Sequence, residues 1–67
     1  MSSHGAITKR LYTIPEAGIY LGRSDWSVRR LIWRGDLPSV RPPGRLVFVD
    51  LRDMDAFIEQ NKAIENN

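Results

Sequence analysis

The chain has 67 residues and a formal net charge of +2, which predicts one domain with a small core, near the lower size limit for independent folding. It has no cysteine and a single histidine, His4, which argues against disulfides and against a structural zinc site. The absence of cysteine fits a reducing cytoplasm. We expect no bound metal or cofactor. No apolar run approaches the roughly 20 residues of a membrane span, and residues 1–10 lack the apolar stretch of a signal peptide.

The first ten residues are polar and small, and we expect a flexible arm over residues 1–10. Leu11 and Tyr12 then begin a short extended piece, which opens a single domain over residues 11–60. The polar end of the chain, residues 61–67, is expected to fray.

The first predicted helix covers residues 14–21. Thr13 and Glu16 have the spacing of a capping box, in which each side chain accepts a hydrogen bond from the backbone N–H of the other residue. Pro15 lies in the first turn, where its missing N–H costs nothing. Gly22 is expected to end the helix.

The second predicted helix begins after Ser24 as its cap and ends at Gly35. Its apolar side is formed by Val28, Leu31 and Ile32. Its other side is formed by Trp26, Arg29, Arg30 and Trp33. Two short helices joined by a tight turn are the layout of a helix-turn-helix, in which the second helix enters the DNA major groove.

Two strands are predicted after the second helix, over residues 39–41 and 45–49, with the tight loop Pro42-Pro43-Gly44 between them. Asp50 then caps a third helix. The apolar stripe of this helix has helical spacing and consists of Leu51, Met54, Phe57 and Ile58.

Charge is distributed unevenly along the chain. Residues 9–45 hold eight basic and three acidic residues, whereas residues 46–67 hold two basic and five acidic ones. This asymmetry predicts one side turned toward a polyanion and one turned away from it. The alternative is an ordinary solvated surface, but most of the basic residues are arginines, the better ligands for phosphate and guanine.

Four ordered motifs extend the helix-turn-helix pattern: LYTIPEA at residues 11–17, LGRS at 21–24, SVRRLIWRGDLPSVR at 27–41 and DMDAFI at 53–58. With these motifs the chain resembles the excisionase-type winged helix-turn-helix family, which is related to MerR-type DNA-binding domains. Members are small phage or mobile-element excisionases and small transcriptional regulators. The resemblance implies a small α+β winged helix-turn-helix, with three helices and a two-stranded β-hairpin wing.

The resemblance also implies that the second helix enters a major groove and that the wing reaches an adjacent minor groove or its phosphates. The chain departs from many relatives at Leu46 and Phe48, which replace outward basic residues of the wing, and at Trp26 and Trp33, which replace polar or basic residues of the helix.

The candidate DNA-binding residues begin with Ser27, Arg29 and Arg30 on the groove-facing side of the second helix. The alternative for the arginines is that they only keep the protein soluble. Trp26 and Trp33 share the outward stripe and are predicted to pack against sugars or thymine methyls, to contact protein, or to fold into the small core.

The ends of the second helix and the wing complete the candidate site. Arg23 and Ser24 precede the helix and are placed for phosphate contact, whereas Arg34 either joins them or favours the negative helix end. Arg41 and Arg45 flank the wing tip, where they suit a narrow minor groove; the alternative is that they protect strand edges.

Four carboxylates have local explanations as caps or first-turn anions: Asp25, Asp36, Asp50 and Asp53. No nucleophile–base pair or metal set accompanies them, so we expect no catalytic residue and no enzyme activity.

The predicted function is that of an excisionase, or recombination directionality factor, which binds and bends attachment-site DNA for an integrase. Expected partners are double-stranded DNA, further copies of the chain bound cooperatively, and an integrase, in the cytoplasm and nucleoid of a prokaryotic cell. No effector domain is expected. The alternatives are a small transcriptional regulator and a protein-interaction module of the antitoxin or adaptor kind.

Overall fold

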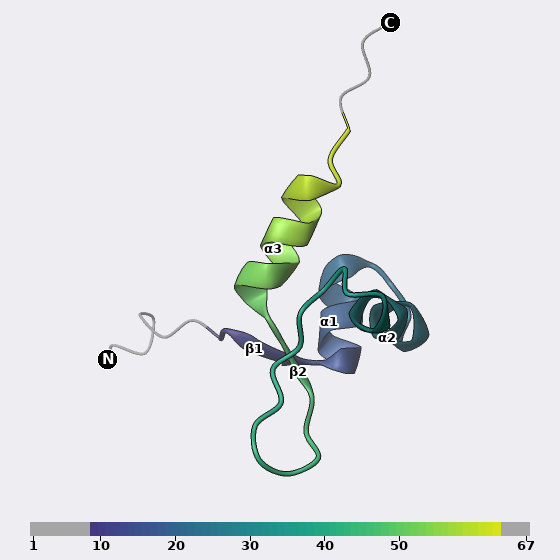
Figure 1. The fold of residues 1–67 in the computed structure, drawn as a ribbon. Coiled ribbons are helices and arrows are strands. Elements are labelled where there is room, and N and C mark those ends of the chain that lie inside the picture. The colour runs from purple at the N-terminus through teal and green to yellow at the C-terminus, as the bar shows by residue number, and fades with distance from the viewer. Residues whose placement is uncertain (1–8, 64–67) are drawn as a thin grey trace, which may run out of the picture.

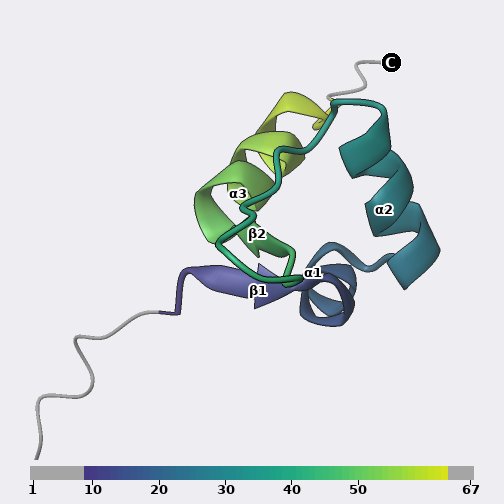
Figure 2. The ribbon, with the colours of Figure 1, turned by 60° about the horizontal axis from the view of Figure 1, so that its bottom comes forward.

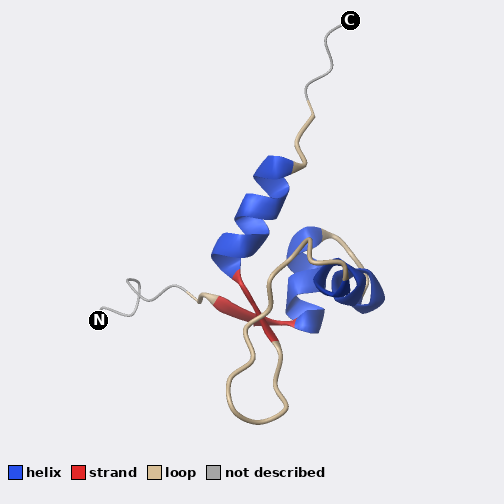
Figure 3. Ribbon diagram, viewed as in Figure 1, coloured by secondary structure: helices blue, strands red, loops and turns tan. Residues whose placement is uncertain are grey.

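The computed structural model describes residues 9–63. The fold consists of three short helices and a small antiparallel sheet of two strands (Figures 1 and 3). In chain order the elements are β1 (Leu11–Thr13), α1 (Ile14–Leu21), α2 (Asp25–Trp33), β2 (Phe48–Asp50) and α3 (Leu51–Gln60). The predicted fold class, a small α+β winged helix-turn-helix with three helices, is confirmed.

The capping box at the start of α1 forms as predicted. The Thr13 N–H donates to Glu16 Oε1 at 2.9 Å, and the Glu16 N–H donates to Thr13 Oγ1 at 3.3 Å. Lys9 Nζ also donates to the Glu16 carboxylate. The hydrogen bond from Lys9, followed by that from the Thr13 backbone, lowers the pKa of Glu16 to about 2.

The turn between α1 and α2 depends on two glycines. Gly22 ends α1 in the left-handed conformation, with φ 70°. The Arg23 N–H then donates to the Gly18 carbonyl at 2.8 Å, so the chain folds back over α1. A Cβ atom on Gly18 would lie 2.5 Å from the Arg23 carbonyl oxygen, which requires a residue without a side chain inside this helix.

Both ends of α2 are closed by residues that the sequence singled out. Ser24 is the N-cap, and its hydroxyl accepts from the Ser27 N–H at 3.1 Å. At the other end Gly35 has φ 80°, and its N–H donates to the Ile32 carbonyl at 3.0 Å. The Asp36 N–H donates to the Leu31 carbonyl at 2.9 Å, which completes a Schellman motif.

The sheet differs from the predicted wing hairpin in its partners. β2 pairs with β1 in the register Leu11–Asp50, Tyr12–Val49 and Thr13–Phe48. Residues 39–41, predicted as a strand, contribute only one bridge on the other edge of β2, between Val40 and Phe48.

Two prolines explain why this bridge does not extend into a ladder. In an antiparallel pair, hydrogen-bonded positions recur every second residue. Val40 and Phe48 exchange both N–H···O bonds, at 2.7 and 2.9 Å. The next such positions are Pro38 and Pro42, and neither has an N–H to donate. The wing is therefore mainly an open loop, which projects from the sheet away from the helices (Figure 1).

The core is small and lies where the helices meet β2. Its buried residues are Ile14, Ala17, Val28, Leu31, Leu37, Val49 and Met54. In α3, Met54 is buried and Leu51, Phe57 and Ile58 are half-buried, which confirms the apolar stripe. No helix within residues 9–63 is long and apolar enough to cross a membrane.

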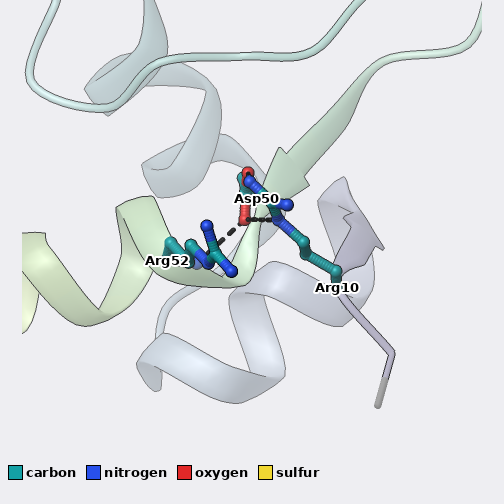
Figure 4. Close-up of polar contacts among 3 residues, drawn as sticks. All are labelled: Arg10, Asp50 and Arg52. Atoms are coloured by element: carbon teal, nitrogen blue, oxygen red, sulfur yellow. Dashed lines mark hydrogen bonds and ion pairs between the residues drawn. The ribbon is translucent and has the colours of Figure 1, made fainter. Parts of the chain in front are cut away.

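Polar contacts join the segment before β1 to α3. Asp50 caps α3 by accepting from the Arg52 N–H at 3.0 Å, and it also accepts from Arg10 Nε and Nη2 at 2.9 to 3.1 Å (Figure 4). The hydrogen bond from Arg10 is the main reason that the pKa of Asp50 lies below its usual value. Of the predicted flexible arm, residues 1–8 lie outside the described residues, whereas Lys9 and Arg10 contact the domain.

Candidate nucleic-acid interface

The outward side of α2 carries four of the predicted site residues, and all four are exposed. Val28 and Leu31 are buried and turn one side of the helix toward the core. The opposite side consists of exposed residues, namely Trp26, Arg29, Arg30 and Trp33. Figure 2 shows α2 at the edge of the body.

Arg29 and Arg30 keep their charge available to an external partner. Within the described residues, neither guanidinium forms an ion pair or hydrogen bond, in contrast to Arg10, which is paired with Asp50. A guanidinium has five donors arranged for bidentate contact with phosphate or with the O6 and N7 atoms of guanine. The geometry therefore fits the groove-facing role that the sequence predicted for them.

Trp26 and Trp33 are both exposed, at 59% and 63%, so neither folds into the core. Their ring centroids lie 5.2 Å apart in an edge-to-face arrangement. The seven-residue spacing placed both on one stripe, but it did not reveal that the rings pack on each other. Two large aromatic side chains that are exposed next to each other are typical of a binding surface.

Arg23, Ser24 and Ser27 lie together at the start of α2. Arg23 Nη1 donates to Ser27 Oγ at 2.6 Å, and the Arg23 guanidinium lies over the Phe57 ring at 5.6 Å. Because the Ser24 hydroxyl caps the helix, it is already engaged. Arg23 retains further N–H groups for a phosphate at the helix start.

Arg34 lies on the side of α2 that faces α3. It forms an ion pair with Asp36 at 3.5 Å, next to a cleft of about 370 Å³ between the two helices. The residue is the C-cap of α2, where the helix dipole favours a cation. Of the two interpretations left open for Arg34, the structure favours the local one.

A family model for the helix-turn-helix domain matches residues 11–62, which includes every described element. The chain belongs to this family. It includes excisionase-like DNA-binding proteins, and the domain indicates a DNA-binding role. No curated protein matches the chain.

The wing of this helix-turn-helix domain presents two exposed arginines. Arg41 Nε donates to Ser39 Oγ at 3.2 Å, whereas Arg45 follows the Pro42-Pro43-Gly44 tip. Leu46 is 60% exposed, as expected for an outward position. Phe48 is half-buried, so it is less exposed than the outward position that the sequence predicted.

Three aspartates of the helix-turn-helix domain form contacts that stabilise the fold. Asp50 caps α3, and Asp36 pairs with Arg34. Asp55 accepts from the Tyr20 hydroxyl at 2.6 Å, which joins α1 to α3 and raises the pKa of Tyr20. These side chains therefore act locally, as the sequence predicted for the caps.

Proposed function

We propose that the protein is an excisionase, or recombination directionality factor, that binds duplex DNA near an attachment site and bends it. The observation that carries the proposal is the outward side of α2, where Arg29 and Arg30 are exposed and have no partner among the described residues. Membership in a family that includes excisionase-like DNA-binding proteins supports it, as do the excisionase-type motifs over residues 11–58.

In this proposal α2 enters the major groove, and the wing loop supplies a second contact through Arg41 and Arg45. The protein acts by binding, without a chemical step, and Asp36, Asp50 and Asp55 serve an ion pair, a helix cap and a hydrogen bond between helices. It would work in the cytoplasm of a prokaryotic cell that carries the phage or mobile element, on the nucleoid.

Arg30→Ala tests the groove contact. If Arg30 reads a base edge, the variant should lose about 1–3 kcal/mol of affinity for a specific duplex and much less for random DNA. If Arg30 holds only a phosphate, both duplexes should lose affinity alike. Arg34→Ala is the matched control, since it removes the same charge at the C-cap of α2, from a side chain paired with Asp36.

Gel-shift titrations at one salt concentration measure both variants. The control should lose less affinity than Arg30→Ala on the specific duplex. If Arg30→Ala binds both duplexes as well as the unsubstituted protein, Arg30 does not belong to the interface, and the orientation proposed for α2 is wrong.

Bending is proposed to require several copies. One domain buries only about 600–1,000 Å² of protein surface on DNA, which offsets a limited bending cost. Copies bound head-to-tail on direct repeats share this cost, and such an arrangement needs no palindrome. Leu46, exposed on the wing, is the candidate for a contact with the next copy or with an integrase.

Footprinting and circular-permutation gels on attachment-site DNA test this assembly. We expect cooperative protection of adjacent repeats and bent DNA, with a monomer in free solution. A free dimer that protects one palindrome on straight DNA would instead identify a small transcriptional regulator. If no duplex is bound even at low salt, the protein-interaction alternative remains.

A further inference from the structure

The indoles of Trp26 and Trp33 lie along the centre of the outward side of α2, here called its crest. Arg29 and Arg30 lie to either side of the crest, on its flanks. Val28 and Leu31 are the buried residues of α2, so the inward direction lies midway between them, at about −30° when Val28 is set at 0°, and the outward direction lies at about 150°. A repeat of 3.6 residues places Trp33 and Trp26 at about 140° and 160° around the helix. Arg29 and Arg30 then lie at about 100° and 200°. The part of the helix that reaches furthest from the core is therefore aromatic, not charged.

The indoles form one continuous apolar ridge. Their edge-to-face contact, with centroids 5.2 Å apart, orders each ring against the other, although more than half of each residue remains exposed. Because a ring ordered before binding loses less conformational freedom on binding, the ridge is prepared for a ligand.

The charges around the ridge favour DNA over protein as this ligand. Arg29 and Arg30 border the ridge on both sides, and neither has a carboxylate partner within residues 9–63. The stripe between them contains no acidic side chain. A surface of this composition complements a groove lined by phosphates on both sides.

We propose that the Trp26–Trp33 ridge reads thymine through its C5-methyl group on the floor of the major groove. This inference rests on the proposed DNA-binding function. In a helix that lies in the groove, the crest meets the base edges and the flanks face the phosphate backbones. The thymine methyl is the one apolar group that the four bases present there. Thymine also offers its O4 atom as an acceptor beside the methyl, which matches an indole that combines an apolar body with one N–H donor.

The test compares thymine with uracil in the same duplex. A duplex selected from a random-sequence pool by the full chain is the probe, and each thymine is replaced singly by deoxyuridine, which removes only the methyl group. Burial of one methyl predicts that replacement at a contacted thymine weakens binding about fourfold. Equal affinity for the two duplexes at every thymine would overturn the proposal.

Substitution of the protein assigns the methyl contact to the ridge. Trp26→Ala and Trp33→Ala, made separately, should each bind the thymine duplex less tightly and lose the difference between thymine and uracil at one or more positions. Arg29→Ala is the control, and it should weaken binding to both duplexes by the same factor. Since both tryptophans are exposed, the variants should keep the far-UV circular dichroism of the parent.

The outcomes separate this inference from the function on which it rests. If the unsubstituted protein binds no duplex, both the excisionase proposal and the thymine contact fail. If it binds duplex DNA but the methyl has no effect, only the thymine contact fails. If the tryptophan variants keep the methyl effect but lose association between copies, the ridge is a protein contact, which also overturns the thymine proposal.

Discussion

Gly18→Ala should destabilise the protein, although alanine is the better helix former. A Cβ atom at this position would lie 2.5 Å from the Arg23 carbonyl oxygen. That oxygen follows Gly22, whose backbone is in the left-handed conformation, so its position is fixed by the turn. To relieve the close contact, α2 would have to move relative to α1. Overpacking costs about 1–3 kcal/mol, whereas replacing glycine in a helix contributes about 1 kcal/mol of stability. We expect a net loss of about 1 kcal/mol, which lowers Tm by about 4–8 °C in a domain of this size.

Thermal unfolding followed by circular dichroism measures this loss. Ala56→Gly is the control, because Ala56 is exposed within α3 and reports helix propensity alone, about 1 kcal/mol. If propensity alone mattered, the two substitutions would shift Tm in opposite directions; we expect both to lower it. A Gly18→Ala variant as stable as the parent protein would refute the close approach of the turn to α1.

The other predictions concern the wing and the cap of α3. Replacing Arg41 and Arg45 together by alanine should flatten the log–log salt dependence of DNA binding by about two units, if both neutralise phosphates. Arg52→Ala, which removes an exposed charge from α3, should leave the slope unchanged, and an unchanged slope for the wing variant would remove the wing from the interface. The hydrogen bond from Arg10 lowers the pKa of Asp50 in the folded protein. The contribution of Asp50 to stability is therefore present above its unfolded pKa of about 4, and it is lost as the pH falls through its folded pKa. Asp50→Asn, which keeps a good N-cap, should therefore lose less Tm between about pH 5 and pH 3 than the parent protein, and equal losses would contradict this assignment.

The helices were predictable because their ends are determined locally. The caps Thr13, Ser24 and Asp50 each accept a hydrogen bond from a backbone N–H two or three residues later. Gly22 and Gly35 end the first two helices with positive φ. Each of these interactions lies within about one helical turn, so the sequence contains both partners side by side.

The sheet was less predictable because its partners are distant in the chain. The extended piece at Leu11 and Tyr12 was expected, but its pairing with β2 spans almost forty residues, and local patterns do not specify such a pairing. The effect of Pro38 and Pro42 depends on the Val40–Phe48 register. Proline positions alone do not show which N–H groups a ladder would need.

The candidate site was predictable in composition but not in its contacts. Helical periodicity placed Arg29, Arg30 and both tryptophans on one side of α2, and the structure exposes all four. Periodicity does not determine rotamers, so it left open whether an indole turns inward, and it did not reveal that Arg23 donates to Ser27. These details depend on side-chain packing after the helices have docked.

The distribution of engaged and unengaged charge suggests how the protein would be oriented on DNA. Arg10 is paired with the cap of α3, and Tyr20 is bonded to Asp55, so polar groups near the sheet and α3 stabilise a domain whose core is small. The outward arginines of α2 take no part in these contacts among the described residues. Figure 2 shows α3 and α2 on opposite sides of the body, and α3 contains more acidic than basic residues. Phosphates would therefore be attracted at α2 and repelled at α3, which favours an approach with α2 toward the groove before any base is contacted.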